Sequence, residues 1–132
     1  MARSITTQLM FQGRQAEAAM DFYVSLFEDA EITELERYDA GEPEREGTVK
    51  HATFTLAGTT FTCIDSPPVH AFTFTPSISL FVECADAQEL ERLYDALVED
   101  GTSLMPPDDY GFSRTFAWVS DRFGVSWQLN LA

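Results

Sequence analysis

The feature that most constrains the fold of this chain is an internal repeat at an offset of 71 residues. Shifting the chain against itself by this offset places Tyr23 on Tyr94 and Leu9 on Leu80. The other identities at the same offset are Ala16 with Ala87, Leu26 with Leu97, Glu28 with Glu99 and Asp29 with Asp100. A duplicated supersecondary unit leaves such matches on segments of the same type. We therefore expect two copies of one structural unit.

Each copy is expected to hold one helix after its first strand. Apolar residues within 16–27 and 90–98 recur at spacings of three and four, which is typical of a helix with one buried face. Asp86 and Glu89 have capping-box spacing, and Gly101 stands where a left-handed residue would end the second helix. The predicted strands are 5–11, 32–38, 49–56 and 59–64 in the first half, and 78–84, 102–105, 115–119 and 125–131 in the second.

Glycine and proline mark the connections between these strands. Ala57-Gly58 and 121–124 are predicted to be tight turns, because glycine tolerates the positive φ of hairpins. The segments 40–47, 66–68 and 106–109 are expected to be loops, since proline has no N–H to donate to a sheet. Each half is therefore predicted to have the element order βαβββ, with its helix on the outer face of the sheet. The sequence predicts one α+β domain over 1–132, with module one at about 1–66 and module two at about 76–132, and with cupped mixed sheets around a cleft.

The charge of the chain excludes some partners. Its formal net charge is -14, from 22 acidic and 8 basic residues. Nucleic acids and anionic membranes bind clustered Lys and Arg, so neither is an expected partner. The acidity favours solubility or adaptation to high salt, and one sequence does not separate the two. The sequence has no apolar run of signal-peptide or membrane-span type, so we expect a cytoplasmic protein. Cys63 and Cys84 lack CxxC spacing and are expected to be reduced and buried.

Four stretches of the sequence resemble a known family: 16–23 (AEAAMDFY), 48–54 (TVKHATF), 77–84 (SISLFVEC) and 121–128 (DRFGVSWQ). With them the whole chain resembles the PhnB-like branch of the glyoxalase, bleomycin-resistance and extradiol dioxygenase superfamily, also called vicinal oxygen chelate proteins. The resemblance implies paired βαβββ modules, a cupped sheet and commonly a homodimer. Some members are labelled demethylubiquinone methyltransferase. Methyl transfer from S-adenosylmethionine usually needs a glycine-rich turn, and the chain has no GxGxxG run.

Strand alternation supplies the candidate site. We expect the side chains facing the cleft to bind an unidentified small molecule, unless this surface is a hydrated seam or a dimer surface. The candidate ligand-binding residues are Thr6, Gln8, His51, Thr53, Thr62, Ser77, Ser79 and Gln128. The motif around His51 holds no paired carboxylate, which favours a structural role over a catalytic one. No catalytic residue is assigned, and the direction of Trp118 is left open.

Two further polar residues are weighed against this site. His70 follows two prolines and is expected to be exposed. Asp65 ends a strand, where it either caps a turn or binds a substrate.

The resemblance also bears on metal binding. In metal-dependent members of the superfamily the ligands lie on the first and last strands of the two modules. Carried onto this chain, those places fall on Thr6, Thr62, Ser77 and Gln128, with Gln8 as the alternative in the first strand. Neutral hydroxyl and amide groups hold divalent ions weakly. We therefore expect no metal and no other cofactor.

Three functional hypotheses follow. The first is a metal-independent protein that binds a small molecule. The second is a lyase, isomerase or dioxygenase that acts on an oxygenated small molecule. The third is a dimerising scaffold that uses aromatic loops such as Tyr110-Gly111-Phe112, and the resemblance favours a homodimer in any case.

Overall fold

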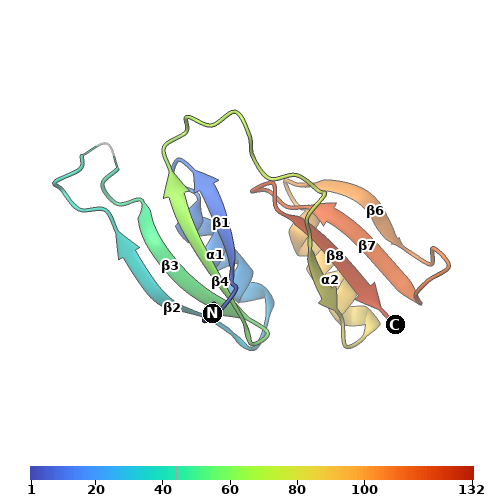
Figure 1. Ribbon diagram of the computed structural model, residues 1–132. Helices are drawn as coiled ribbons and strands as arrows, with labels where there is room; N and C mark the ends of the chain where they lie inside the picture. Colours follow the sequence, from blue (N-terminus) through green and yellow to red (C-terminus); the bar gives the residue numbers. More distant parts are fainter. Residues whose placement is uncertain (44) are drawn as a thin grey trace. The chain divides into compact units, whose positions relative to one another are not determined.

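The computed structural model describes residues 1–43 and 45–132, which form two compact units, Met1–Ala71 and Phe72–Ala132 (Figure 1). The first unit contains β1 (Thr7–Gln12), α1 (Ala16–Leu26), β2 (Ala30–Arg37), β3 (Val49–Leu56) and β4 (Thr59–Ser66). The second contains β5 (Leu80–Glu83), α2 (Ala87–Val98), β6 (Thr102–Asp108), β7 (Thr115–Ser120) and β8 (Ser126–Leu131).

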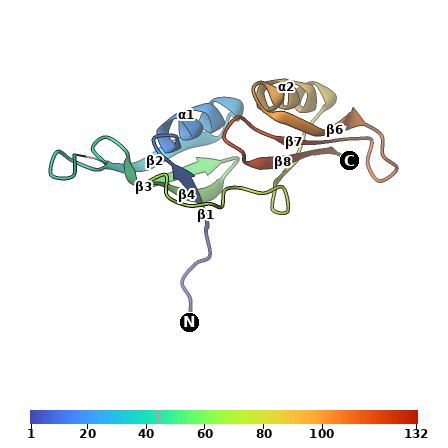
Figure 2. The same ribbon diagram turned by 90° about the horizontal axis from the view of Figure 1, so that it is seen from above.

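The two units have the same topology. The strand order is β1-β4-β3-β2 in the first sheet and β5-β8-β7-β6 in the second. In each sheet the first and last strands of the unit pair in parallel, and the other neighbours pair antiparallel. The predicted α+β class and the two βαβββ units are confirmed. Within each unit the helix lies across one face of its sheet (Figure 2), and we call the other face the open face.

The core of the first unit lies between α1 and its sheet. The buried helix residues are Ala16, Ala19, Met20, Tyr23 and Leu26, all of them among the predicted apolar positions, whereas Phe27 follows the helix and is only half-buried. They face the buried strand residues Leu9, Phe11, Ala52, Phe54, Phe61 and Cys63. Burying each large side chain contributes about 1.5–3 kcal/mol. The helix is held to its sheet mainly by this apolar contact.

The second unit repeats this arrangement with other residues. Leu90, Leu93 and Leu97 of α2 are buried, and so are Val119, Trp127 and Leu129 of the sheet. Asp86 caps α2 by accepting the N–H of Glu89 at 2.8 Å. The Glu89 carboxylate accepts the N–H of Ala85 at 2.8 Å, so the predicted capping pair forms.

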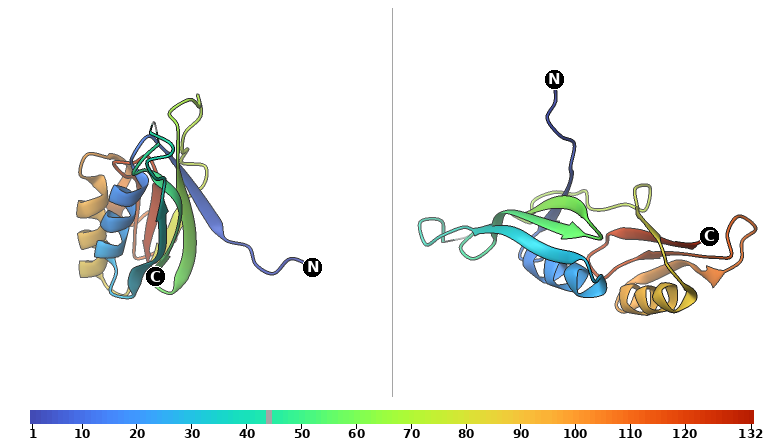
Figure 3. Two further views of the ribbon diagram at one scale, coloured as in Figure 1. Left: turned by 90° about the vertical axis from the view of Figure 1, so that its left-hand side faces the viewer. Right: turned by 90° about the horizontal axis from the view of Figure 1, so that it is seen from below.

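Both first strands are shorter than predicted. The ladder of β1 begins at Thr7, and that of β5 begins at Leu80. Ile5 and Ile78 lie within the predicted strands, where alternation would turn them toward the helices, but they are 98% and 70% exposed. The alternation rule fails there, because it applies only while a strand is held by its neighbour. The residues before β1 run away from the sheet (Figure 3).

Prolines inside β6 contradict the predicted loop at 106–109, since the strand continues through Pro106 and Pro107 to Asp108. β6 is the edge strand of its sheet and pairs only with β7. Its register shifts between Met105 and Asp108, so the prolines occupy an irregular stretch of the ladder. An edge strand tolerates proline where no inward N–H is needed. The prediction was wrong because it treated proline as incompatible with every strand.

Positive φ values lie partly where they were predicted. Ala57 and Gly58 have φ of 49° and 81°, and Gly124 has φ of 90°, as expected for tight turns. After α2, however, Asp100 takes the left-handed conformation in place of Gly101. Gly101 is required for a different reason, because a Cβ there would lie 2.2 Å from the backbone oxygen of Ser120.

Cys63 and Cys84 are both buried and free, as predicted. Desolvation, with a contribution from Asp65, raises the pKa of the Cys63 thiol to about 12. Desolvation is also the main cause that raises the pKa of Cys84 to about 11. Both thiols are therefore neutral packing groups at neutral pH. Among the described residues, no helix has the length and apolar composition to cross a membrane.

Candidate functional site

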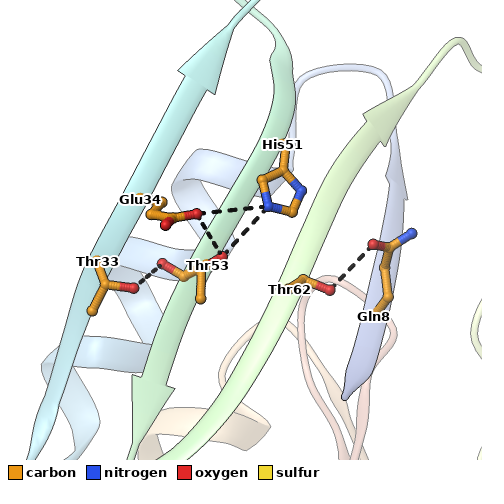
Figure 4. Close-up of polar contacts among 6 residues, drawn as sticks. All are labelled: Gln8, Thr33, Glu34, His51, Thr53 and Thr62. Atoms are coloured by element: carbon orange, nitrogen blue, oxygen red, sulfur yellow. Dashed lines mark hydrogen bonds and ion pairs between the residues drawn. The ribbon is translucent and has the colours of Figure 1, made fainter. Parts of the chain in front are cut away.

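A polar row crosses the open face of the first sheet. The register pairs Gln8 with Thr62, Thr62 with Thr53, and Thr53 with Glu34, so one residue of each strand lies in the row. Figure 4 shows these side chains on neighbouring strands. The Thr62 hydroxyl donates to Oε1 of Gln8 at 3.1 Å, and that of Thr53 donates to Oε2 of Glu34 at 3.3 Å. The row thus joins three predicted site residues to one acid that was not predicted.

His51 lies beside this row. Its Nε2 is 3.9 Å from Oε2 of Glu34 and 3.5 Å from Oγ1 of Thr53 (Figure 4). His51 shares the open face with Thr53 and Thr55, because Ala52, Phe54 and Leu56 are buried against the helix. The motif around His51 holds no carboxylate, but Glu34, from outside the motif, lies beside the imidazole.

The carboxylate was missed because it comes from another strand. The register of β2 shifts between Ile32 and Glu34, which leaves Thr33 as an extra residue. The Thr33 hydroxyl donates to the backbone oxygen of Thr53 at 3.2 Å. Simple alternation from Ile32 would have placed Glu34 on the helix side. A β-bulge of this kind is not visible in the sequence pattern.

The open face of the second sheet carries a neutral hydrogen-bonded cluster. The hydroxyls of Ser79 and Ser126 lie 2.7 Å apart, and Nε2 of Gln128 donates to Oγ of Ser79 at 3.2 Å. The indole N–H of Trp118 donates to Oγ of Ser126 at 2.9 Å. This bond fixes the direction of Trp118, which sequence analysis left open. The predicted residues Ser79 and Gln128 are thus brought together.

Thr6 and Ser77 do not join these clusters. Both lie before the first strand of their unit, and both are exposed. The Ser77 hydroxyl lies 2.7 Å from that of Thr75. The short first strands therefore separate these two residues from the other predicted site residues.

Aromatic side chains lie on the same open face of the second sheet. Phe116 alternates with the buried Ala117 on β7 and lies on the Trp118 side. Its ring contacts those of Phe112 at 4.9 Å and Phe81 at 6.5 Å between centroids. Phe81 is 56% exposed and Phe112 62%. Phe116 was missed because its direction depended on that of Trp118.

Asn130 lies beside the aromatic rings, opposite Phe116 in the register. Its Nδ2 donates to both carboxylate oxygens of Glu83, at 3.2 and 3.0 Å. Asn130 is buried, and its Oδ1 has no hydrogen-bond partner in the described part of the chain. A buried acceptor without a donor is costly, which makes this atom a place where a ligand donor would be favourable.

Two buried carboxylates serve the fold. Asp65 accepts the N–H of Ala16 and that of Val49, each at 2.9 Å, so it caps α1 and fixes the start of β3. Of its two predicted roles, capping is the one that the structure displays. Asp121 accepts the backbone N–H groups of Phe123 and Val125 and the indole N–H of Trp127. His70 is exposed, as predicted.

The residues at the family's metal positions do not fit a metal ion. Thr62 is bonded to Gln8 in the first sheet, and Gln128 is bonded to Ser79 in the second. These groups are neutral hydroxyls and amides, whereas divalent ions exchange their water for carboxylate, imidazole or thiolate. In residues 1–43 and 45–132 no three His, Cys, Asp or Glu side chains lie together as a metal site would require. We derive no chemistry through a metal.

Comparisons with known proteins identify the family. A family model described as 3-demethylubiquinone-9 3-methyltransferase matches residues 3–130. A search of curated proteins found no match. The solved structure of a PhnB protein from Bacillus cereus, described as a "Putative 3-demethylubiquinone-9 3-methyltransferase", is 53% identical, with 98% of this chain and 100% of that chain covered and a TM-score of 0.93.

More distant solved structures share the fold. One from Pseudomonas aeruginosa is 24% identical, with a TM-score of 0.74 and 98% of each chain covered. A glyoxylase/bleomycin resistance protein/dioxygenase domain from Frankia is 14% identical, with a TM-score of 0.64, covering 100% of this chain and 93% of that one. These two show the fold alone. The family model and the Bacillus structure establish that the chain belongs to the 3-demethylubiquinone-9 3-methyltransferase family, which includes that PhnB protein.

Proposed function

We propose that this protein binds a small organic molecule on the open faces of its sheets without a catalytic metal. The observation that carries the proposal is the cluster of Ser79, Ser126, Gln128 and Trp118, whose polar atoms bond to one another on a face that its own helix does not cover. Small-molecule sites combine aromatic surface with a few placed polar groups.

The composition of the second sheet indicates the kind of ligand. The exposed ring of Phe81 and the indole of Trp118 offer flat apolar contact. The unpartnered Oδ1 of Asn130 accepts a donor, and Glu83 adds a negative charge beside it. A ligand with a flat apolar part and at least one N–H or O–H donor fits these groups.

Ligand screening by native mass spectrometry with a broad metabolite library tests the proposal. We expect a retained small molecule whose affinity falls about tenfold in Gln128→Ala, because a polar partner is lost. Gln88→Ala is the matched control, since Gln88 is exposed on α2, and it should bind like the parent protein. The proposal fails if no compound is retained, or if both variants bind equally.

A homodimer and a cytoplasmic location belong to the same proposal. The exposed rings of Phe81 and Phe112 support pairing of two copies, since large exposed apolar groups gather at interfaces. Light scattering should give twice the chain mass at micromolar concentration. Monomers throughout that range would remove the dimer from the proposal.

One observation favours a second candidate function, acid–base catalysis by a lyase or isomerase. His51 and Glu34 lie 3.9 Å apart on an accessible surface, and an imidazole oriented by a carboxylate can take up a proton from a bound substrate. Turnover in glyoxalase or ring-cleavage assays that falls by about 10²–10⁴ in His51→Gln would establish this function. Turnover that is absent, or unchanged in the variant, would leave binding as the function.

The methyltransferase description of the family receives no support from the residues present. S-adenosylmethionine sites usually use a glycine-rich turn that leads into a helix with a free N-terminus. Here the sequence has no GxGxxG run, and the N–H of Ala16 at the start of α1 already donates to Asp65. We therefore derive no methyl-transfer step.

A further inference from the structure

A pocket lies at one end of the first unit, away from the residues proposed above. Three connections line it: the one between β1 and α1, the one that follows β4, and the one that leads into β3, and all three leave the same end of the sheet (Figure 1). The lining residues that matter here are Arg14, Arg45, Thr48, Pro67, Pro68 and Val69. The pocket has a volume of about 400 Å³, which is enough for a small metabolite.

Hydrogen bonds tie the pocket walls together. The N–H of Gly13 donates to the backbone oxygen of Ser66 at 2.8 Å, joining two of the connections. The Arg14 guanidinium donates through Nη2 to the backbone oxygen of Glu46 at 2.6 Å, joining the third. The Thr48 hydroxyl donates to the backbone oxygen of Arg45 at 2.6 Å. The pocket is thus largely formed before any ligand arrives.

The charge of the pocket is opposite to that of the chain. The protein has 22 acidic residues and 8 basic ones. Among the described residues, Arg37 pairs with Glu17 and Lys50 with Glu36, whereas Arg14 and Arg45 form no ion pair. Within the described part of the chain, these two guanidinium groups have no carboxylate partner, and both line one pocket of a strongly acidic protein. Such groups bind carboxylate or phosphate groups through paired N–H donors.

The geometry of the two arginines leaves donors for a ligand. The Arg45 guanidinium lies over the Tyr38 ring at 4.0 Å, and stacking occupies its face and leaves its N–H edges available. The amino group of Lys50 lies 5.8 Å from the same ring, but it pairs with Glu36 and does not line the pocket. Arg14 uses one nitrogen for Glu46 and retains other donors.

We propose that this pocket binds a small molecule bearing an oxyanion, a carboxylate or a phosphate, through Arg14 and Arg45. Pro67, Pro68 and Val69 form an apolar wall that suits a short hydrocarbon part of the ligand. The site is independent of the proposed binding on the open faces, because it uses none of the same residues. The negative charge of the whole chain opposes non-specific anion binding, so anion binding that saturates indicates a formed site.

Amide NMR titration of the full chain tests the proposal, with sodium phosphate in one series, sodium propionate in a second, and sodium chloride at matched ionic strength as the reference. We expect saturable shifts at the amides of Gly13, Gly47 and Thr48 with phosphate, propionate or both, and none at Gly124 in the second unit. The series that saturates identifies the anionic group. Binding should weaken as the concentration of added chloride rises.

Variants separate a specific site from general charge. Arg45→Gln and Arg14→Gln should each weaken binding about tenfold, since each removes a charge-assisted pair of donors. Arg45→Lys keeps the positive charge but loses the paired N–H donors of the guanidinium. It should therefore weaken binding less than Arg45→Gln does. Arg114→Gln makes the same charge change at an exposed arginine in the second unit and should bind like the parent protein.

The proposal is overturned if neither anion gives saturable shifts, or if Arg114→Gln weakens binding as much as Arg45→Gln does. A well-dispersed amide spectrum for each variant excludes unfolding as the cause. Arg14→Gln loses the hydrogen bond to the backbone oxygen of Glu46 and could fail to fold for that reason. In that case the titration of the parent protein decides whether the pocket binds an anion.

Discussion

The two units share a topology but differ in the chemistry of their open faces. The first sheet carries an ionisable group, with His51 and Glu34 beside a row of threonine and glutamine. The second carries neutral serine and glutamine next to Trp118 and Phe116. The strand order and the helix-facing core are repeated, whereas the open faces are not. The two units thus share the topology and the position of the core, and they differ in the residues that can meet a ligand.

The largest expected effect comes from removing the main aromatic core residue of either unit. Tyr23→Ala and Trp127→Ala should each lower the free energy of unfolding by about 3–5 kcal/mol, because both side chains are buried and leave cavities. Urea unfolding followed by far-UV circular dichroism measures the change. Ile5→Ala, at a side chain that is 98% exposed, is the control and should cost about 0.5 kcal/mol or less.

The same experiment tests whether the chain is one domain. If residues 1–132 fold as one cooperative unit, Tyr23→Ala and Trp127→Ala will each show a single transition. Two separate transitions in either variant would mean that Met1–Ala71 and Phe72–Ala132 unfold independently.

The helix caps differ between the units, and a smaller effect follows from this difference. α1 is capped by Asp65, a buried residue 49 positions away that also holds the N–H of Val49. α2 is capped locally by the exposed Asp86. Asp65→Ala should therefore cost about 2–3 kcal/mol, since two buried donors lose their acceptor, and Asp86→Ala only about 1 kcal/mol. Equal losses in thermal or urea unfolding would contradict the buried role of Asp65.

Much of the first sheet could be predicted from the sequence, because β3 alternates regularly from His51 to Leu56. The buried Phe54 and Leu56 fix the direction of His51 and Thr53. Glu34 could not be predicted, since the bulge at Thr33 reverses the face on which it lies. The first residues of β1 and β5 could not be predicted either. Ile5 and Ile78 extend the apolar pattern to positions before the first paired residue of each strand.

The second sheet was less predictable because its edge strand is irregular. The repeat could not give the register of Trp118, as the two hairpins differ in loop length. The bond from Trp118 to Ser126 settles it and places Phe116 on the same face. The arginine pocket depends on three connections that meet only in the folded unit. A pocket formed by three connections that are distant in the sequence has no local sequence pattern from which it could be predicted.

The smallest expected effect concerns the two thiols. Burial raises the pKa of Cys63 to about 12 and that of Cys84 to about 11, from an ordinary value of 9.0. The unfolded chain therefore loses thiol protons at lower pH than the folded chain does. The stability that the protonated thiols contribute is fully present below about pH 9 and is lost as the pH rises towards about 11 and 12.

Alkylation by iodoacetamide over a series of pH values, read by mass spectrometry, compares the two thiols in the folded protein. Cys84 should react at lower pH than Cys63, because its pKa is lower and it is slightly more exposed. Faster reaction of Cys63 would show that the first unit opens more readily than the second.

Metal content tests the central claim, binding without a metal, most directly. The chain is purified without chelator and without a His tag, and zinc, nickel, manganese and iron are measured by plasma mass spectrometry. The account predicts well under about 0.1 metal ion per chain, because Thr62 and Gln128 offer neutral oxygen and nitrogen atoms that already bond to Gln8 and Ser79. A near-stoichiometric metal that is lost in Gln128→Ala would contradict it and would make the enzyme the leading function.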